Sequence, residues 1–150
     1  MSKKFPLQSV LDLSQMKLEE ATRHLGELIS GEQRAAERLD LLVRYRAEYQ
    51  ARFLESAREG IGREQWRNFQ HFLDKLDAAL AQARQLVDQS HELRSAGQRE
   101  WLDRRGRVKA FDTLAVRHRT QQVYEEGHRE QKITDEHAAR LRPNDLNRDD

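Results

Sequence analysis

Cysteine is absent from this chain of 150 residues, and proline occurs only at Pro6 and Pro143. Without cysteine the chain can form no disulfide, no thiolate metal site and no thiol nucleophile, a composition that fits a reducing compartment. Because both prolines stand near the ends, the interior contains no strong helix breaker. These absences exclude several kinds of site and allow long, uninterrupted helices.

Long apolar runs are also missing. No segment approaches the roughly 18 consecutive apolar residues of a membrane-spanning helix. The N-terminal lysines are not followed by an apolar stretch of signal-peptide length, so we expect no signal peptide. Hydrophobic residues make up 37% of the chain and charged residues 35%. This composition is too polar for the core of a globular domain of 150 residues. It suffices for a seam between two helices, which needs about two apolar positions in seven.

Residues suited to a helical seam recur every seven positions on both sides of Gly60-Ile61-Gly62. Before the glycines, the first seam positions are Leu11, Leu18, Leu25, Glu32, Leu39, Arg46 and Phe53, and the second are Ala21, Leu28, Ala35, Leu42 and Tyr49. After them, the first are Trp66, Leu73, Leu80, Val87, Arg94, Trp101, Val108 and Ala115, and the second are Phe69, Leu76, Ala83, Ser90, Gly97, Arg104 and Phe111. Such a repeat keeps one narrow face turned towards a single partner helix. We therefore predict an all-α fold, a long antiparallel two-helix coiled-coil hairpin.

The predicted hairpin is a single domain over residues 1–150. Helix 1 is expected at about 7–58, the turn at 59–62, helix 2 at about 63–140 and a disordered tail at 142–150. We expect Gly60 and Gly62 to adopt the positive φ angles that end the first helix and redirect the chain.

The longer second helix has a consequence for pairing. Antiparallel pairing about residue 61 places Leu11 beside Ala110 and leaves the chain after about residue 115 without an internal partner. Residues 1 to about 7 are expected to be an unpaired lead-in. In the same register Arg94, at a seam position, falls near Leu28 and Glu27, which allows a salt bridge across the seam that would fix the register.

The residues that would carry chemistry are not grouped. No two of the six histidines are spaced i, i+4, and Gly60-Ile61-Gly62 lacks the lysine and preceding strand of a phosphate-binding loop. Carboxylate pairs such as Glu19-Glu20 and Glu125-Glu126 are expected on an open helix surface, which neither excludes water nor raises a pKa for acid catalysis. We therefore predict that the chain is not an enzyme and has no catalytic residue, cofactor or metal site.

A second apolar stripe runs beside the seam of helix 2. Its residues follow one another at intervals of three or four, so they share one edge of the helix. They are Phe72, Leu76, Ala79, Ala83 and Leu86. The stripe either widens the core or forms an apolar ridge that a partner binds. The sequence leaves both interpretations open.

One block is more distinctive than the heptads. It begins at the turn and contains Gly60, Ile61, Trp66, Asn68, Phe69, Gln70, Phe72, Leu73, Leu76, Ala79, Leu80 and Gln82. The first helix adds Ala21, Leu25, Gly26, Glu27, Leu42, Tyr45, Glu48 and Tyr49. In these residues, and in its length, turn position and short tail, the chain resembles the family of the flagellar export protein FliJ.

The resemblance implies a non-enzymatic component of the flagellar type III protein export apparatus, which serves flagellum biogenesis, motility and chemotaxis. Members of the family form a coiled coil similar to the central stalk of rotary ATPases. They bind the centre of the export ATPase hexamer, promote its assembly and activity, contact the export gate membrane protein and escort export chaperones. They are cytoplasmic and associate peripherally with the inner membrane at the flagellar base.

The resemblance also implies site residues. The gate contact of the family corresponds to Phe72, Leu76 and Ala79. The turn and tip of the hairpin comprise Gly60, Ile61, Gly62, Trp66, Asn68 and Phe69. No small-molecule substrate or cofactor is implied.

Two alternatives stay open. A stalk protein of a virulence-type III secretion system would have the same design. A coiled-coil adaptor for nucleic acid would use the basic stretch 94–119, which carries eight Lys or Arg against three Asp or Glu. A net charge of +1 and the seam positions of Trp101 and Phe111 argue against the adaptor, so no nucleic acid is expected as a partner.

Overall fold

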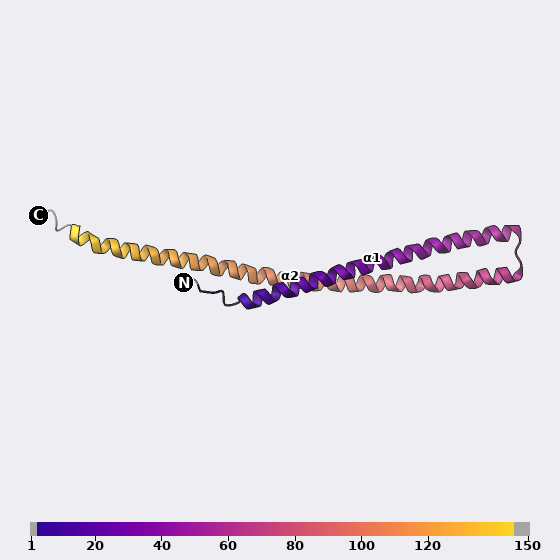
Figure 1. The fold of residues 1–150 in the computed structure, drawn as a ribbon, viewed down its shortest axis with the longest axis horizontal. Helices are drawn as coiled ribbons and strands as arrows, with labels where there is room; N and C mark the ends of the chain where they lie inside the picture. The colour runs from indigo at the N-terminus through magenta and orange to yellow at the C-terminus, as the bar shows by residue number, and fades with distance from the viewer. Residues whose placement is uncertain (1–2, 146–150) are drawn as a thin grey trace. The chain divides into compact units, whose positions relative to one another are not determined.

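The computed structural model describes residues 3–145, with side chains described up to residue 141. Over this range it has two elements, the 52-residue helix α1 (Gln8–Glu59) and the 83-residue helix α2 (Arg63–Asp145), and no strand. The two helices pack against each other in opposite directions after the short connection at residues 60–62 (Figure 1). The predicted all-α hairpin is confirmed.

The turn depends on one glycine. Gly60 has a φ angle of 95° and directly follows the last residue of α1, where a left-handed residue ends a helix and reverses the chain. Gly62 does not take a positive φ, so the expectation of two such glycines is wrong. Instead the carbonyl of Gly62 accepts a hydrogen bond of 3.0 Å from the Trp66 amide and so belongs to the first turn of α2. One left-handed residue is sufficient because the next helix begins at Arg63.

α2 continues further than expected. It ends at Asp145, so residues 142–145 are helical where a disordered tail was predicted, and residues 146–150 lie outside the described part of the chain. Pro143 lies within the last turns of the helix rather than beyond it. A proline in a helix removes one backbone donor and crowds the carbonyl four residues earlier, which here belongs to Ala139. Because Ala139 is exposed, water can hydrogen-bond to that carbonyl in place of the missing donor.

The chain divides into two compact units. The first unit comprises the residues up to Leu18 together with those from Arg104 onward, and the second comprises Glu19–Asp103 and contains the turn. α1 and α2 each contribute to both units.

In the second unit the predicted seam is the core. Phe53, Leu76, Leu80 and Ala83 are buried, and Gly97 is buried as well. The other predicted seam positions of this unit are half-buried, with the exception of Trp66, which is 47% exposed. Trp66 lies only three residues after the start of α2, so the helices provide little beyond it to cover its outer face. The heptad pattern therefore predicts the core correctly up to the end of the seam.

In the first unit Leu11 and Ala115 form the core. The segment before α1 was expected to be unpaired, but it contacts α2. The centre of the Phe5 ring lies 5.5 Å from that of the His118 ring, and the Lys3 carbonyl accepts a hydrogen bond of 2.6 Å from Gln122 Nε2. For the same reason pairing does not end near residue 115. A non-helical segment rises further per residue than a helix, so the few residues before α1 reach positions on α2 beyond Ala115.

Candidate partner-binding surface near the hairpin turn

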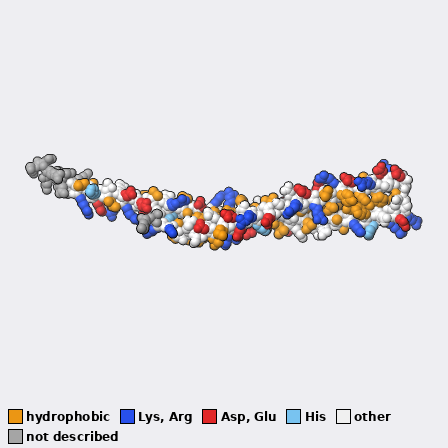
Figure 2. All heavy atoms as spheres, in the orientation of Figure 1, with side chains coloured by type: hydrophobic (Ala, Val, Ile, Leu, Met, Phe, Trp, Pro, Cys, Tyr) orange, Lys and Arg blue, Asp and Glu red, His pale blue; other side chains and the backbone are white. Residues whose placement is uncertain are grey.

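Aromatic rings from both helices alternate along the seam beside the turn. The Phe53 ring lies 5.0 Å from both Trp66 and Phe69, and the Tyr49 ring lies 5.3 Å from Phe69. All three contacts are tilted, the kind of arrangement that aromatic pairs prefer to a face-to-face stack. Figure 2 shows hydrophobic side chains gathered on the visible face over this part of α1 and α2. The seam near the turn is therefore closed by aromatic contacts.

Phe72 continues this series towards the flank of the hairpin. Its ring lies 4.4 Å from Tyr49, and it meets the Tyr45 ring edge-on at 6.3 Å. Phe72 is half-buried, while Tyr45 is exposed. Phe72 thus has one side against the tyrosines of α1 and another side open to a partner.

The three residues that the family resemblance assigns to the gate contact differ in burial. Leu76 is only 7% exposed and belongs to the core, whereas Phe72 and Ala79 are half-buried. Further along the same stripe, Ala83 is buried and Leu86 is exposed. The stripe is therefore part core and part surface, since Leu76 and Ala83 point inward while Phe72, Ala79 and Leu86 lie along the flank.

Two residues that contact Phe72 were not identified as site residues from the sequence. Tyr45 and Tyr49 belong to the distinctive residues of the first helix, but the pattern of one helix does not show what its side chains meet on the other. The signal that would have found Tyr45 is its position directly before the seam residue Arg46, just as Phe72 directly precedes the seam residue Leu73. In an antiparallel pair such positions lie on the same flank.

The predicted tip residues lie around the turn and differ in burial. Ile61 is half-buried, Asn68 is exposed, and Phe69 is half-buried beneath Phe53 and Tyr49. Trp66 contacts Phe53 with one face. The tip therefore presents part of an indole ring to solvent.

A charged pair lies across the seam close to the aromatic series. Arg46 Nε donates a hydrogen bond of 2.5 Å to Asp77 Oδ1, and Arg46 Nη1 donates one of 3.1 Å to Gln50. The hydrogen bond with Asp77 raises the pKa of the Arg46 guanidinium above its ordinary value. Arg46 occupies a first seam position, and its long side chain reaches the surface to find these partners.

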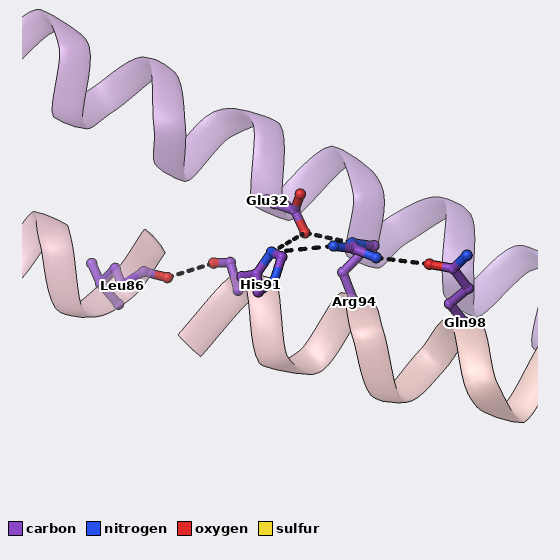
Figure 3. A network of polar contacts seen from close by, with 6 residues as sticks. Glu32, Leu86, His91, Arg94 and Gln98 are labelled. Carbon is purple, nitrogen blue, oxygen red and sulfur yellow. Dashed lines mark hydrogen bonds and ion pairs between the residues drawn. The ribbon is translucent and has the colours of Figure 1, made fainter. Parts of the chain in front are cut away.

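A second polar group interrupts the seam further from the turn (Figure 3). Arg94 Nε donates a hydrogen bond of 2.7 Å to Glu32 Oε2, and its other nitrogens lie 2.7 Å from Gln98 Oε1 and 3.1 Å from His91 Nδ1. Figure 3 shows Glu32 descending from α1 into a fork formed by Arg94 and His91 of α2. The predicted salt bridge across the seam is present, but its partner is Glu32 rather than Glu27.

The difference in partner has a geometric cause. Side chains on an α-helix lean towards the helix N-terminus. In an antiparallel pair, Arg94 therefore leans towards the turn and Glu32 leans away from it, so long side chains meet residues about one helical turn off the backbone register. Trp101 Nε1 donates a hydrogen bond of 3.0 Å to Thr22 Oγ1, and this pair follows the backbone register more closely than Arg94 and Glu32 do.

Three features are missing from the described residues. Among them there is no group of three or more His, Cys, Asp or Glu placed to hold a metal ion. Within the same range no charged or polar side chain is buried. Neither helix, as far as the structure describes it, has an apolar stretch long enough to cross a membrane.

Comparison with known proteins identifies the family. Residues 2–144 match the family model described as Flagellar FliJ protein. The Flagellar FliJ protein of Escherichia coli (strain K12) is 33% identical over 134 residues, covering 89% of this chain and 91% of the relative. The Flagellar FliJ protein of Salmonella typhi is 31% identical with the same coverage. With both helices included in the match and the predicted hairpin present, this chain belongs to the flagellar FliJ protein family.

Proposed function

We propose that the protein is a non-enzymatic component of the flagellar type III protein export apparatus, in which its coiled coil serves as a stalk for the export ATPase. In this role it binds the centre of the ATPase hexamer, promotes assembly and activity of the hexamer, contacts the export gate and escorts export chaperones. It would act in the cytoplasm, at the cytoplasmic face of the inner membrane. The observation that carries the proposal is the match to flagellar relatives along both helices.

The distribution of apolar side chains supports contact with more than one partner. Near the turn, Phe72 and Ala79 form a flank that is half-open to solvent beside the exposed Tyr45. On the other unit, Val123, Tyr124 and Ile133 of α2 are exposed on a single helix. The exposed apolar residues near the turn adjoin one another, which is typical of protein–protein contacts, while those of α2 are spaced along the helix. We assign the flank near the turn to the gate and the α2 segment from residue 123 to the ATPase.

The experiment that tests the proposal is steady-state ATP hydrolysis by the cognate export ATPase, titrated with the purified protein. Hydrolysis should rise to a plateau as the protein is added, because a stalk that orders the hexamer saturates with it. Val123→Asp should weaken this stimulation by roughly tenfold, since a charge in an apolar contact costs at least about 1.4 kcal/mol.

Leu41→Asp is the matched control. Leu41 is exposed on α1 in the other unit, so the same kind of substitution there should leave stimulation unchanged. Absence of stimulation by the unmodified protein at every ratio would refute the stalk role. Equal loss with both variants would instead refute the assignment of the α2 segment.

A further inference from the structure

A groove in the first unit combines apolar and cationic side chains. It has a volume of about 370 Å³ and lies between residues 10–17 of α1 and residues 104–111 of α2. The apolar part of its lining is Val10, Leu13 and Phe111, and the cationic part is Lys17, Arg104 and Arg107. The remaining lining residue is a serine, so no acid lines the groove.

The apolar part is open to solvent. Val10 is 38% exposed and Leu13 is 51% exposed, while Phe111, at a seam position, is half-buried. Leu114, one heptad after Arg107, is exposed as well and extends the apolar surface along α2. Apolar residues exposed next to one another in this way mark surfaces that a partner covers.

The charges are arranged in an unusual way for a coiled coil. Lys17 directly precedes the seam residue Leu18, and Arg107 directly precedes the seam residue Val108. These flanking positions commonly hold opposite charges that form ion pairs between helices. Here both are cations, and Arg104 adds a third in the same groove. Cations gathered in one groove attract an anion.

Arg104 and Arg107 also take part in other interactions within the chain. A guanidinium group has five N–H donors in a planar fork, so it can keep such interactions and still bind a carboxylate. The groove is about two helical turns long, since its lining spans residues 10–17 and 104–111, eight residues of each helix, at about 1.5 Å per residue. Its long axis follows the two helices, which is the shape that receives a third helix.

We propose that this groove docks an acidic amphipathic helix of a partner protein. The apolar face of that helix packs on Val10, Leu13 and Phe111, and its flanking carboxylates pair with Lys17, Arg104 and Arg107. Charge complementarity and the apolar floor together select this partner. A nucleic acid would leave the apolar floor uncovered, and a small anion would occupy only the cationic edge. The inference does not depend on the export role.

The test uses a fluorescent synthetic peptide of three heptads, with leucine at the seam positions and glutamate at the flanking positions, titrated with the full chain at low salt. Fluorescence anisotropy should show saturable binding that weakens as salt is raised, because carboxylate–cation pairs are screened. A peptide of the same composition in scrambled order should bind at least tenfold more weakly, since its leucines no longer share one face.

Lys17→Glu is the decisive variant. It should weaken binding of the acidic peptide at least tenfold, while the thermal stability of the protein stays the same or rises because an acid now lies beside Arg104 and Arg107. Loss of binding therefore cannot be attributed to unfolding. Leu13→Gln should weaken binding several-fold through the apolar floor. Arg34→Glu, an exposed cation in the other unit, is the control and should bind like the unmodified protein.

Four outcomes would overturn the inference. Equal binding of the scrambled peptide would show that the groove is a general polyanion site. Displacement of the acidic peptide by single-stranded oligonucleotide would indicate nucleic acid, and displacement by phosphatidylglycerol vesicles would indicate a lipid surface. An unchanged affinity in Lys17→Glu would place the binding elsewhere on the protein.

Discussion

The Gly97 backbone of α2 lies directly against the Leu28 side chain of α1, so that a Cβ built on Gly97 would overlap Leu28 Cδ1. Gly26 differs, because a Cβ added there would meet open space. Gly97 occupies a second seam position and is buried, whereas Gly26 is exposed on the outer side of α1. The missing side chain at Gly97 thus allows Leu28 to fill the seam.

Substitution of these glycines should separate helix propensity from packing. Gly26→Ala should raise the free energy of unfolding by about 1 kcal/mol, the gain in helix propensity. Gly97→Ala should give close to no gain, because Leu28 must rotate away, and Gly97→Val should lower the free energy of unfolding by roughly 1–3 kcal/mol through overpacking. Urea denaturation followed by far-UV circular dichroism measures all three. Equal gains from the two alanine variants would contradict the close contact.

The Glu32–Arg94 pair should contribute more to register than to stability. Both side chains are partly exposed and occupy seam positions, so Glu32→Ala should lower the free energy of unfolding by about 1 kcal/mol, the net value of a charge-assisted hydrogen bond at such a site. Replacing both with leucine should restore or exceed the original stability, because a leucine pair fits a seam. A double-mutant cycle in urea denaturation measures the coupling.

The register itself has a separate readout. The chain has no cysteine, so one spin label can be placed on each helix and their distance distribution measured. The leucine pair should broaden that distribution relative to the unmodified protein. A distribution as narrow as the original one would show that the Glu32–Arg94 pair does not determine the register.

The seam was predictable from the sequence because it depends on local periodicity. Leu11, Phe53, Leu80 and Ala115 were all expected at seam positions and are all buried. Which residues pair across the seam depends on the direction in which the side chains lean and on the conformation of the turn. The heptad periodicity contains neither. For this reason the partner of Arg94 was misassigned.

The candidate site was predictable only as a stripe. The spacing that groups Phe72 with Leu76 and Ala79 could not say which of them faces the other helix, since a helix edge beside a seam is half core and half surface. The contacts of Phe72 with Tyr45 and Tyr49 require both helices to be placed. The groove at Lys17 and Arg107 likewise arises only from the pairing of distant segments.

Phe72 should be the informative position for the proposed gate contact. Phe72→Asp should weaken binding to the gate at least tenfold and lower the free energy of unfolding by a few kcal/mol, since the ring loses its contacts with Tyr45 and Tyr49. Surface plasmon resonance with the cytoplasmic part of the gate measures the first effect and thermal denaturation the second.

Leu80→Ala is the control for this prediction, because Leu80 is buried in the seam and its loss destabilises by about 2–5 kcal/mol without altering the flank. Gate binding of the folded Leu80→Ala variant should match that of the unmodified protein. If each variant lost gate binding in proportion to its loss of stability, the stripe would belong to the core alone and would not be a binding surface.

The contact between the lead-in and α2 should protect α2 locally. Phe5→Ala removes the ring that lies against His118, and with it the anchor that keeps the Lys3 carbonyl near Gln122. Amide hydrogen exchange over residues 115–122 should then accelerate several-fold, because fewer tertiary contacts oppose local opening of the helix. Tyr124→Ala is the matched control, since the Tyr124 ring stacks on His128 of the same helix, 6.1 Å away. It should leave exchange at residues 115–122 unchanged, whereas equal acceleration in both variants would show that α2 frays there regardless of the lead-in.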